Sequence, residues 1–287
     1  MKISIQQDKQ KILDANIYVH AFLANTGEYQ KSPHFRPENQ VKVRAILERV
    51  ILPLNNIQAK KAIDFGCGTG FVIHLMKDLF SEIHGVDITQ DMMNHVDLSS
   101  GNIFLHESLA ENTPFDNESF DFATAYSFMD HLTDYRVFLN EVYRVLKKGG
   151  VFYSDLNPNR SFIQAMDNAE SKFINTTELS PIVKREIVGA LHNGEYYKEN
   201  FGMDAEMLEQ AEPGKTIEKG FDAGETVKFA QSLGFSTCMV EYEWYLGQAK
   251  VMHEQSVEIS NLVEAYLNST LPVSESLFKY LRFIFIK

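Results

Sequence analysis

Short apolar runs alternate with amphipathic stretches through most of this chain of 287 residues. The short runs are bounded by polar or glycine positions, which is typical of buried strands. Seven of them lie at 62–65, 83–87, 102–105, 120–126, 151–154, 235–245 and 278–286. Helical spacing of apolar positions predicts helices between them, at 69–80, from about 90, and at 135–146, 223–233 and 251–267. Strands that alternate with helices favour parallel pairing, with helices on both faces of one sheet.

Two stretches interrupt this alternation. Residues 1–54 read as helices broken near Ser32–Pro37, and residues 157–221 read as a helical insertion after the fifth strand. The remaining segments, 55–156 and 222–287, then form one α/β core. We therefore expect a doubly wound, seven-stranded, mostly parallel sheet with N-terminal helices. An insertion at that point lies near the carboxyl ends of the strands, where open α/β sheets bind ligands.

Composition narrows the class of protein. The chain has 27 Lys and Arg against 39 Asp and Glu, a net charge of −12, which disfavours a general nucleic-acid binder because that binding depends on cationic side chains. Two cysteines imply no disulfide framework. No apolar run approaches the length of a membrane span, and the N-terminus has no signal-peptide pattern. We expect a cytoplasmic protein, a monomer or homodimer, that binds neither nucleic acid nor membrane.

A glycine-rich turn carries the strongest chemical signal. The sequence Asp64-Phe65-Gly66-Cys67-Gly68-Thr69-Gly70 joins the first strand to a helix, so its backbone can approach a ligand closely. Asp87 ends the next strand, where a carboxylate can accept hydrogen bonds from both hydroxyls of a ribose. This combination predicts a nucleoside site. Nicotinamide enzymes use G-x-G-x-x-G for a pyrophosphate, whereas the spacing here is G-x-G-x-G after an acid that suits a cationic amino group.

These motifs resemble the class I S-adenosylmethionine-dependent methyltransferases. IDFGCGTG and HGVDIT look like the first two motifs of that family, AENTPFDNESFDFATAYSFMDHL like the third and fourth, and EVYRVLKKGGVFYSDLNP like its fifth-strand region. The resemblance covers 62–158 and 224–245. It implies a Rossmann-like methyltransferase fold, the cofactor S-adenosyl-L-methionine with S-adenosyl-L-homocysteine as product, and methyl transfer to O, N or C of a small or medium organic acceptor.

The resemblance also implies cofactor contacts. Asp64 would hold the ammonium group, Asp87 the ribose hydroxyls, and Ile88 would pack on the adenine. The methionine moiety would lie along Gly66, Cys67, Gly68 and Gly70. Both acids could instead serve only as caps.

Further contacts follow from the same resemblance. Leu109 stands where many members have an aspartate for the adenine amine, which leaves the Ala110 N–H for a ring nitrogen. Tyr126 would lie under the sulfonium, in the stretch that ends the fourth strand. In related enzymes an N-terminal segment closes over the cofactor, so Tyr29 and His34 are candidates for the methionine carboxylate, although both could be ordinary surface or core rings. The insertion 157–221 would act as a substrate lid.

His131 is the candidate catalytic base, because an imidazole can take a proton from a hydroxyl acceptor. A structural polar residue is an equal reading of His131, and Asp130 is a weaker candidate. No His, Cys, Asp and Glu spacing indicates a metal site. Three alternatives stay open: a nicotinamide-dependent oxidoreductase, a non-catalytic S-adenosylmethionine-binding module, and a methyltransferase that acts on protein or RNA.

Overall fold

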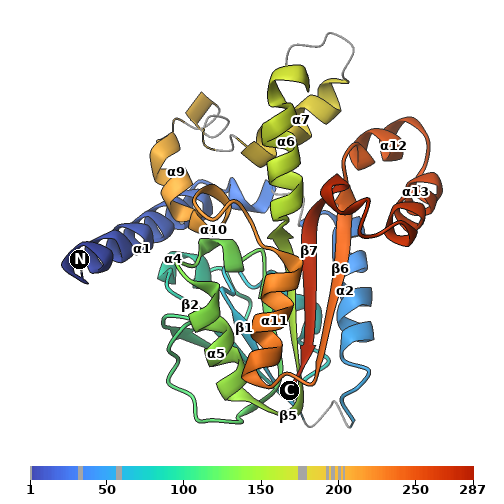
Figure 1. Ribbon diagram of the computed structural model, residues 1–287. Helices are drawn as coiled ribbons and strands as arrows, with labels where there is room; N and C mark the ends of the chain where they lie inside the picture. The colour runs from blue at the N-terminus through green and yellow to red at the C-terminus, as the bar shows by residue number, and fades with distance from the viewer. Residues whose placement is uncertain are drawn as a thin grey trace.

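The seven predicted strands form one mixed sheet in the computed structural model, which describes residues 2–31, 35–55, 60–173, 180–191, 194, 198–199, 202 and 204–287 (Figure 1). The strands are β1 (Lys61–Phe65), β2 (Glu82–Asp87), β3 (Ile103–Glu107), β4 (Phe120–Tyr126), β5 (Leu146–Pro158), β6 (Thr237–Tyr245) and β7 (Phe278–Ile286). Their order is β3-β2-β1-β4-β5-β7-β6. Strands β1 to β5 pair in parallel, and β7 is antiparallel to both β5 and β6. The prediction of a doubly wound, mostly parallel sheet is confirmed.

Both faces of the central strands β1 and β4 are buried, which explains why they read as continuous apolar runs. Side chains alternate between two hydrophobic clusters along a strand, as the two-residue period requires. In β5, Phe152 belongs to one cluster and Tyr153 to the other. In β7, Phe283 and Ile284 divide in the same way.

Helices cover the two faces. The helices α2 (Pro37–Val50) and α3 (Phe71–Met76) contribute to one cluster, and α5 (Tyr135–Val145) and α11 (Ala223–Leu233) to the other. Asp134 caps α5 by accepting a hydrogen bond from the Arg136 N–H at 2.9 Å. The short helix α4 (Gln90–Met93) follows β2.

A helical layer lies over the carboxyl ends of the parallel strands (Figure 1). It consists of α1 (Lys2–Asn25), the turn η1 (Tyr29–Lys31), α6 (Arg160–Phe173), α7 (Pro181–Leu191), α9 (Ala205–Ala211) and α10 (Pro213–Thr216). Val19 and Leu23 of α1 pack with Leu208 and Ala211 of α9. The N-terminal segment and the insertion therefore meet over the end of the sheet where a ligand is expected. None of the described helices is long and apolar enough to cross a membrane.

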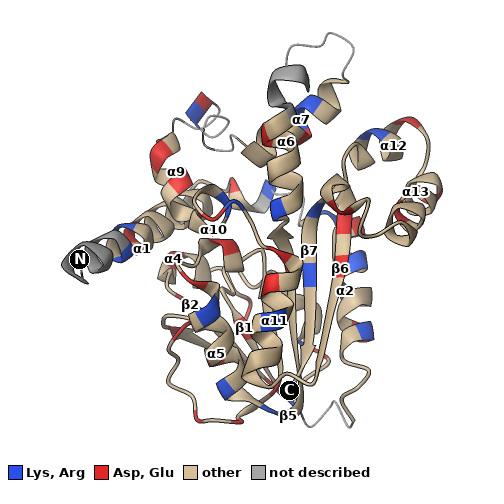
Figure 2. Ribbon diagram, in the orientation of Figure 1, with Lys and Arg blue, Asp and Glu red and all other residues tan. Residues whose placement is uncertain are grey.

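Charged residues gather on the side of β5 away from β4, where β7 and β6 lie (Figure 2). Arg282 of β7 is 5% exposed and donates hydrogen bonds to Asp155, Glu241 and Glu243. Lys42 of α2 lies 3.2 Å from the Glu243 carboxylate. This ionic network, buried at Arg282, Asp155 and Glu243, joins β5, β6, β7 and α2.

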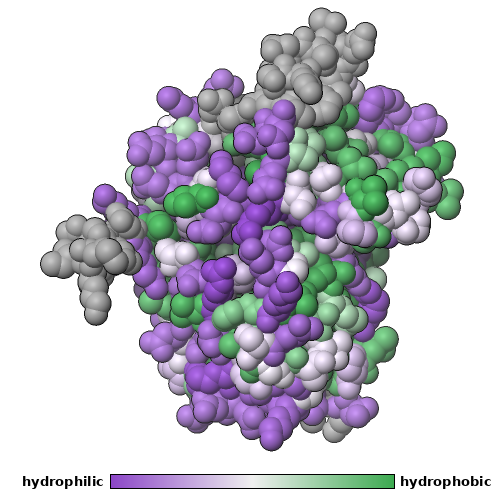
Figure 3. Space-filling view, in the orientation of Figure 1, coloured by the Kyte–Doolittle hydropathy of each residue, from purple (hydrophilic) through white to green (hydrophobic). Residues whose placement is uncertain are grey.

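The single helix predicted over 251–267 is wrong. The structure has two helices there, α12 (Gln248–Glu254) and α13 (Val257–Ser269), and the 3₁₀ turn η5 (Glu275–Leu277) follows. Ser256 ends the continuity because its hydroxyl caps α13, accepting from the Ile259 N–H at 3.2 Å. Apolar side chains remain exposed on this helix pair, as Figure 3 shows, and they include Met252, Val257, Ile259, Leu262 and Tyr266.

Candidate active site

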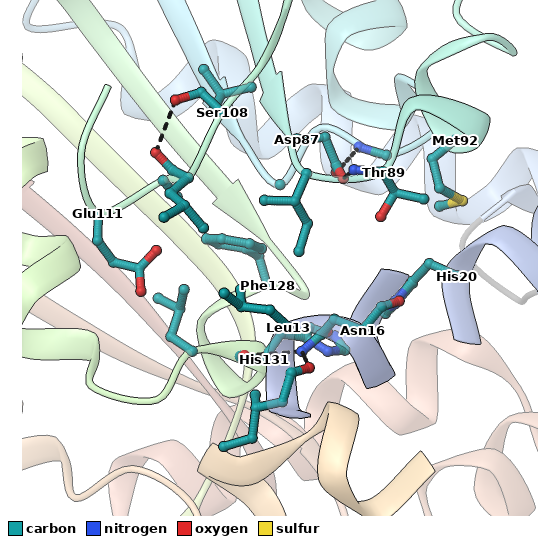
Figure 4. A pocket seen from close by; sticks show the side chains of 18 of the residues that line it. Leu13, Asn16, His20, Asp87, Thr89, Met92, Ser108, Glu111, Phe128 and His131 are labelled. Atoms are coloured by element: carbon teal, nitrogen blue, oxygen red, sulfur yellow. Dashed lines mark hydrogen bonds between the residues drawn. The ribbon is translucent and has the colours of Figure 1, made fainter. Parts of the chain in front are cut away.

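A pocket opens at the carboxyl ends of β1, β2, β3 and β4, beneath α1 (Figure 4). The empty space in and around it, open solvent included, is about 770 Å³. The predicted site residues on its wall are Tyr29, Gly66, Gly68, Asp87, Ile88, Leu109, Ala110, Tyr126 and His131. Asp64, Cys67 and Gly70 are buried and do not line the pocket, and His34 lies outside the described residues. The pocket thus brings together residues that are far apart in the sequence.

The glycine turn is anchored to the end of β2. The N–H groups of Gly66 and Cys67 both donate to the Val86 carbonyl, at 2.8 and 3.0 Å. Gly66 has a φ of +65°, and a Cβ there would lie 2.0 Å from the Phe128 ring. Only glycine fits this position, because both the backbone angle and the Phe128 ring exclude a side chain. The Cys67 side chain packs in the core, where burial raises the pKa of its thiol, so it is no nucleophile.

Asp87 fixes the same turn with its carboxylate. Its Oδ2 accepts from the Gly68 N–H at 2.9 Å, and its Oδ1 accepts from the Thr89 N–H at 2.8 Å. Burial raises the pKa of Asp87, and these two N–H groups oppose that rise. The Thr89 side chain is a third donor to this carboxylate, which has four lone pairs in all. The side chain can therefore hold the turn and accept hydrogen bonds from a diol at once.

Asp64 lies beneath the glycine turn and is 2% exposed. Its Oδ1 accepts a hydrogen bond from the Thr124 hydroxyl at 2.5 Å. Burial, with repulsion from Asp87, raises the pKa of Asp64 to about 7. A nearby cation would favour its ionised form, so an ammonium group is a fitting partner for Asp64, reached directly or through water.

The part of the pocket wall that follows β3 is formed by apolar residues and one acidic residue. Leu109 and Ala110 line the pocket together with Ile88, and this set suits the flat faces of a purine. Glu111 follows them, and its carboxylate lies 3.5 Å from the Lys9 ammonium of α1. This ion pair joins α1 to the loop after β3 at the pocket.

Two tyrosines complete the wall near the glycine turn. The Tyr126 hydroxyl accepts from the Asn39 side-chain amide at 3.4 Å, and burial raises the pKa of Tyr126 above its ordinary value. The Tyr29 hydroxyl lies 3.5 Å from the point where a Cβ on Gly68 would stand. The Tyr29 hydroxyl can therefore reach a ligand that rests on the turn.

His131 follows β4 in the 3₁₀ turn η4 (Met129–His131) and lines the pocket. Its Nδ1 lies 2.8 Å from the Ala211 carbonyl. A carbonyl only accepts, so Nδ1 carries the hydrogen and Nε2 keeps a lone pair. Oδ1 of Asp130 lies 4.0 Å from His131 Nε2. That oxygen is buried and has no hydrogen-bond partner among the described residues, and burial raises the pKa of Asp130.

Helix α1 supplies pocket residues that the sequence reasoning did not select. They are Lys9, Ile12, Leu13, Asn16 and His20, and they recur three or four positions apart on one helix face. That spacing was the available signal. Thr89, Met92, Phe128 and Leu132 were also missed. In the described part of the chain, no three His, Cys, Asp or Glu side chains are placed to hold a metal ion.

Parts of this chain are similar in sequence to known proteins. Residues 63–154 match the family model described as "Methyltransferase domain". The ubiquinone biosynthesis O-methyltransferase of Paraburkholderia phymatum is 31% identical over 122 residues, which cover 40% of this chain and 53% of that protein. The protein of the same name from Pseudomonas entomophila is 26% identical over 217 residues, which cover 63% of this chain and 90% of that protein.

A solved structure shares the fold. One chain of the complex between the Haloferax volcanii Trm112 methyltransferase activator and a methyltransferase gives a TM-score of 0.52 at 14% identity. The match covers 93% of this chain and 96% of that chain. The likeness is one of fold, and it extends over most of the chain.

Proposed function

The chain belongs to the class I S-adenosylmethionine-dependent methyltransferases, and on that basis we propose that it methylates a hydroxyl group of a small, largely apolar acceptor. The choice of a hydroxyl as the methylated group rests on His131. This residue lines the same pocket as the glycine turn and Asp87, and its Nδ1 donates to the Ala211 carbonyl. Two relatives are named O-methyltransferases, and methyl transfer to oxygen is consistent with those names. We keep, as predictions, a cytoplasmic enzyme that is a monomer or homodimer.

The residues of the pocket fit the cofactor. The Asp87 carboxylate can accept hydrogen bonds from a ribose diol, and Ile88 and Ala110 offer apolar surface for the adenine. Asp64, which is buried and does not line the pocket, can serve the ammonium group through water. When bound, S-adenosylmethionine supplies a methyl group activated by a positively charged sulfur. The chain then has to hold the acceptor in line and keep water out.

His131 provides the proton acceptor. A hydroxyl is a weak nucleophile until it loses its proton, and the Nε2 lone pair of His131 can take that proton as the oxygen–carbon bond forms. The imidazolium would then lie 4.0 Å from the Asp130 carboxylate oxygen, which favours the positive charge. Leu13, Phe128 and Leu132 supply apolar walls for the acceptor.

The direct test is ligand binding followed by turnover. We expect S-adenosylhomocysteine to bind in calorimetry and NADH not to bind. With S-adenosylmethionine present, 4-butylphenol should yield S-adenosylhomocysteine, whereas 4-butylaniline and 4-butylbenzoate should not. Methylation of the aniline alone would overturn the hydroxyl acceptor, and binding of NADH alone would overturn the cofactor assignment.

Asp87→Ala should weaken binding of S-adenosylhomocysteine by at least about tenfold. The variant loses charge-assisted hydrogen bonds to the ribose, each worth about 1.5–3 kcal/mol, and it also frees the Gly68 N–H. Calorimetry measures the affinity, and circular dichroism checks that the fold is intact. Asp116→Ala is the matched control, because Asp116 is an exposed aspartate away from the pocket. Equal affinity in the Asp87 variant and the control would remove Asp87 from the site.

A further inference from the structure

We propose that His20 is a second residue that positions the acceptor, and that it selects acceptors with a hydrogen-bond donor beside the hydroxyl that is methylated. The proposal rests on the proposed function and deepens it. Its basis is the meeting of His20 from α1 and His131 from η4 on one wall of the pocket.

Hydrogen bonding fixes the form of the His20 ring. Its Nδ1 lies 2.8 Å from the Asn16 carbonyl, one turn earlier in α1. The carbonyl accepts, so Nδ1 donates and Nε2 carries a lone pair. Burial, and next the neighbouring His131, lowers the pKa of His20 to about 4, so the ring is neutral at neutral pH. His20 is therefore a hydrogen-bond acceptor at Nε2.

The outer edge of the ring is available to a ligand. Because Nδ1 faces the backbone of α1, Nε2 lies on the edge that points away from that helix. In the described part of the chain no residue donates a hydrogen bond to this nitrogen. The His20 and His131 rings meet edge to face, with centroids 4.9 Å apart and planes at 77°. The Asn16 amide also donates to the His131 carbonyl at 3.4 Å, which ties α1 to η4.

The Nε2 atoms of His20 and His131 are two neighbouring hydrogen-bond acceptors, so they suit a ligand with two neighbouring hydrogen-bond donors. One hydroxyl has one hydrogen, and His131 takes that hydrogen in the proposed reaction. The His20 lone pair is then satisfied by a second O–H or N–H on the acceptor. An acceptor without that second donor leaves a desolvated nitrogen unpaired, which costs affinity.

The charges around the two rings disfavour an acidic acceptor. Glu212 and Lys215 of the α10 region pair at 3.1 Å, so this ammonium group is already neutralised. Although burial alone would raise it, Lys215 and His131 hold the pKa of Glu212 below its ordinary value. Asp130 adds a second acid on the η4 side, and Lys9, across the pocket, pairs with Glu111. An uncharged donor suits this wall better than a carboxylate or a phosphate.

The test uses two probes and two variants in the full chain loaded with S-adenosylhomocysteine. The probes are 4-butylcatechol, which has the second hydroxyl, and 4-butylphenol, which lacks it. His20→Asn keeps an amide near the Nδ1 position and loses the Nε2 acceptor, whereas His20→Gln places its carbonyl oxygen near Nε2. We expect the wild type to bind the catechol about two- to tenfold more tightly than the phenol. This ratio should fall to about one in His20→Asn and survive in His20→Gln.

The ratio separates positioning from structure. A merely structural role would weaken both probes equally, keep the ratio in His20→Asn, and overturn the proposal. A ratio of one in the wild type would also overturn it, while methylation of 4-butylphenol would leave the proposed function intact. Failure of the wild type to bind S-adenosylhomocysteine would instead overturn the proposed function itself.

Discussion

His131→Ala is expected to lower kcat by about 10²–10⁴-fold, the usual contribution of a positioned general base. The affinity for S-adenosylhomocysteine should stay within about twofold of the wild-type value, because the predicted cofactor contacts are on other residues. Single-turnover measurements with the best hydroxyl acceptor give the rate, and calorimetry gives the affinity.

Two further variants separate the base from the fold. His131→Asn keeps an amide that can donate to the Ala211 carbonyl, the role now filled by Nδ1, and lacks Nε2. It should be as slow as His131→Ala if the Nε2 lone pair takes the proton. His95→Ala is the matched control, since His95 is exposed outside the pocket, and it should keep the wild-type rate. A wild-type rate in both His131 variants would leave proximity alone as the source of catalysis.

The sheet could be predicted because each strand carries its own local signal. Ile63 and Phe65 lie in a run buried on both faces, and the glycine turn that follows marks the end of β1. Asp87 was identifiable because it stands at a fixed place after that turn. Parallel sheets bring the carboxyl ends of neighbouring strands to one edge, so spacing along the chain was enough to place Asp87 and the glycine turn at the same pocket.

The acceptor wall could not be derived in the same way, because it forms where three distant segments meet. His20 touches His131 across more than a hundred residues, and Ala211 from the insertion fixes the ring of His131. No local pattern announces such a meeting. The spacing of the pocket residues on α1 indicates one functional face of that helix. Which part of the molecule this face covers depends on how α1 docks, and α1 docks by packing a neighbouring set of residues against α9.

The ionic network around Arg282 was equally hidden, because the run FKYLRFIFIK reads as a buried strand, and nothing in it sets Arg282 apart from Lys279 and Lys287. In the structure, Arg282 Nε donates to Asp155 Oδ2 at 2.8 Å, and Asp155 also accepts from the Tyr153 hydroxyl at 2.6 Å. Burial and the neighbouring Glu243 raise the pKa of Asp155 to about 6, against the pull of Arg282. Asp155 is next to the site, since its carbonyl accepts from the Ser127 N–H at 3.0 Å.

Arg282→Met should lower the free energy of unfolding by about 3–5 kcal/mol, because it leaves Asp155 and Glu243 buried without their shared cation. Denaturant unfolding followed by circular dichroism measures the loss. Arg49→Met is the matched control: Arg49 binds the same Glu241 at 2.7 Å, but its side chain is 50% exposed, so the loss should stay below about 1 kcal/mol.

The pH dependence of that loss has a definite sign. Without Arg282 the pKa of Asp155 rises further above its value in an unfolded chain, so ionisation of Asp155 opposes folding. The cost is absent below the unfolded pKa, grows as pH rises from the unfolded towards the folded pKa, and is constant above the folded pKa. The difference between Arg282→Met and wild type should therefore be larger at pH 8 than at pH 5. An equal difference at both values would mean that Arg282 acts through packing of its alkyl stem rather than through its charge.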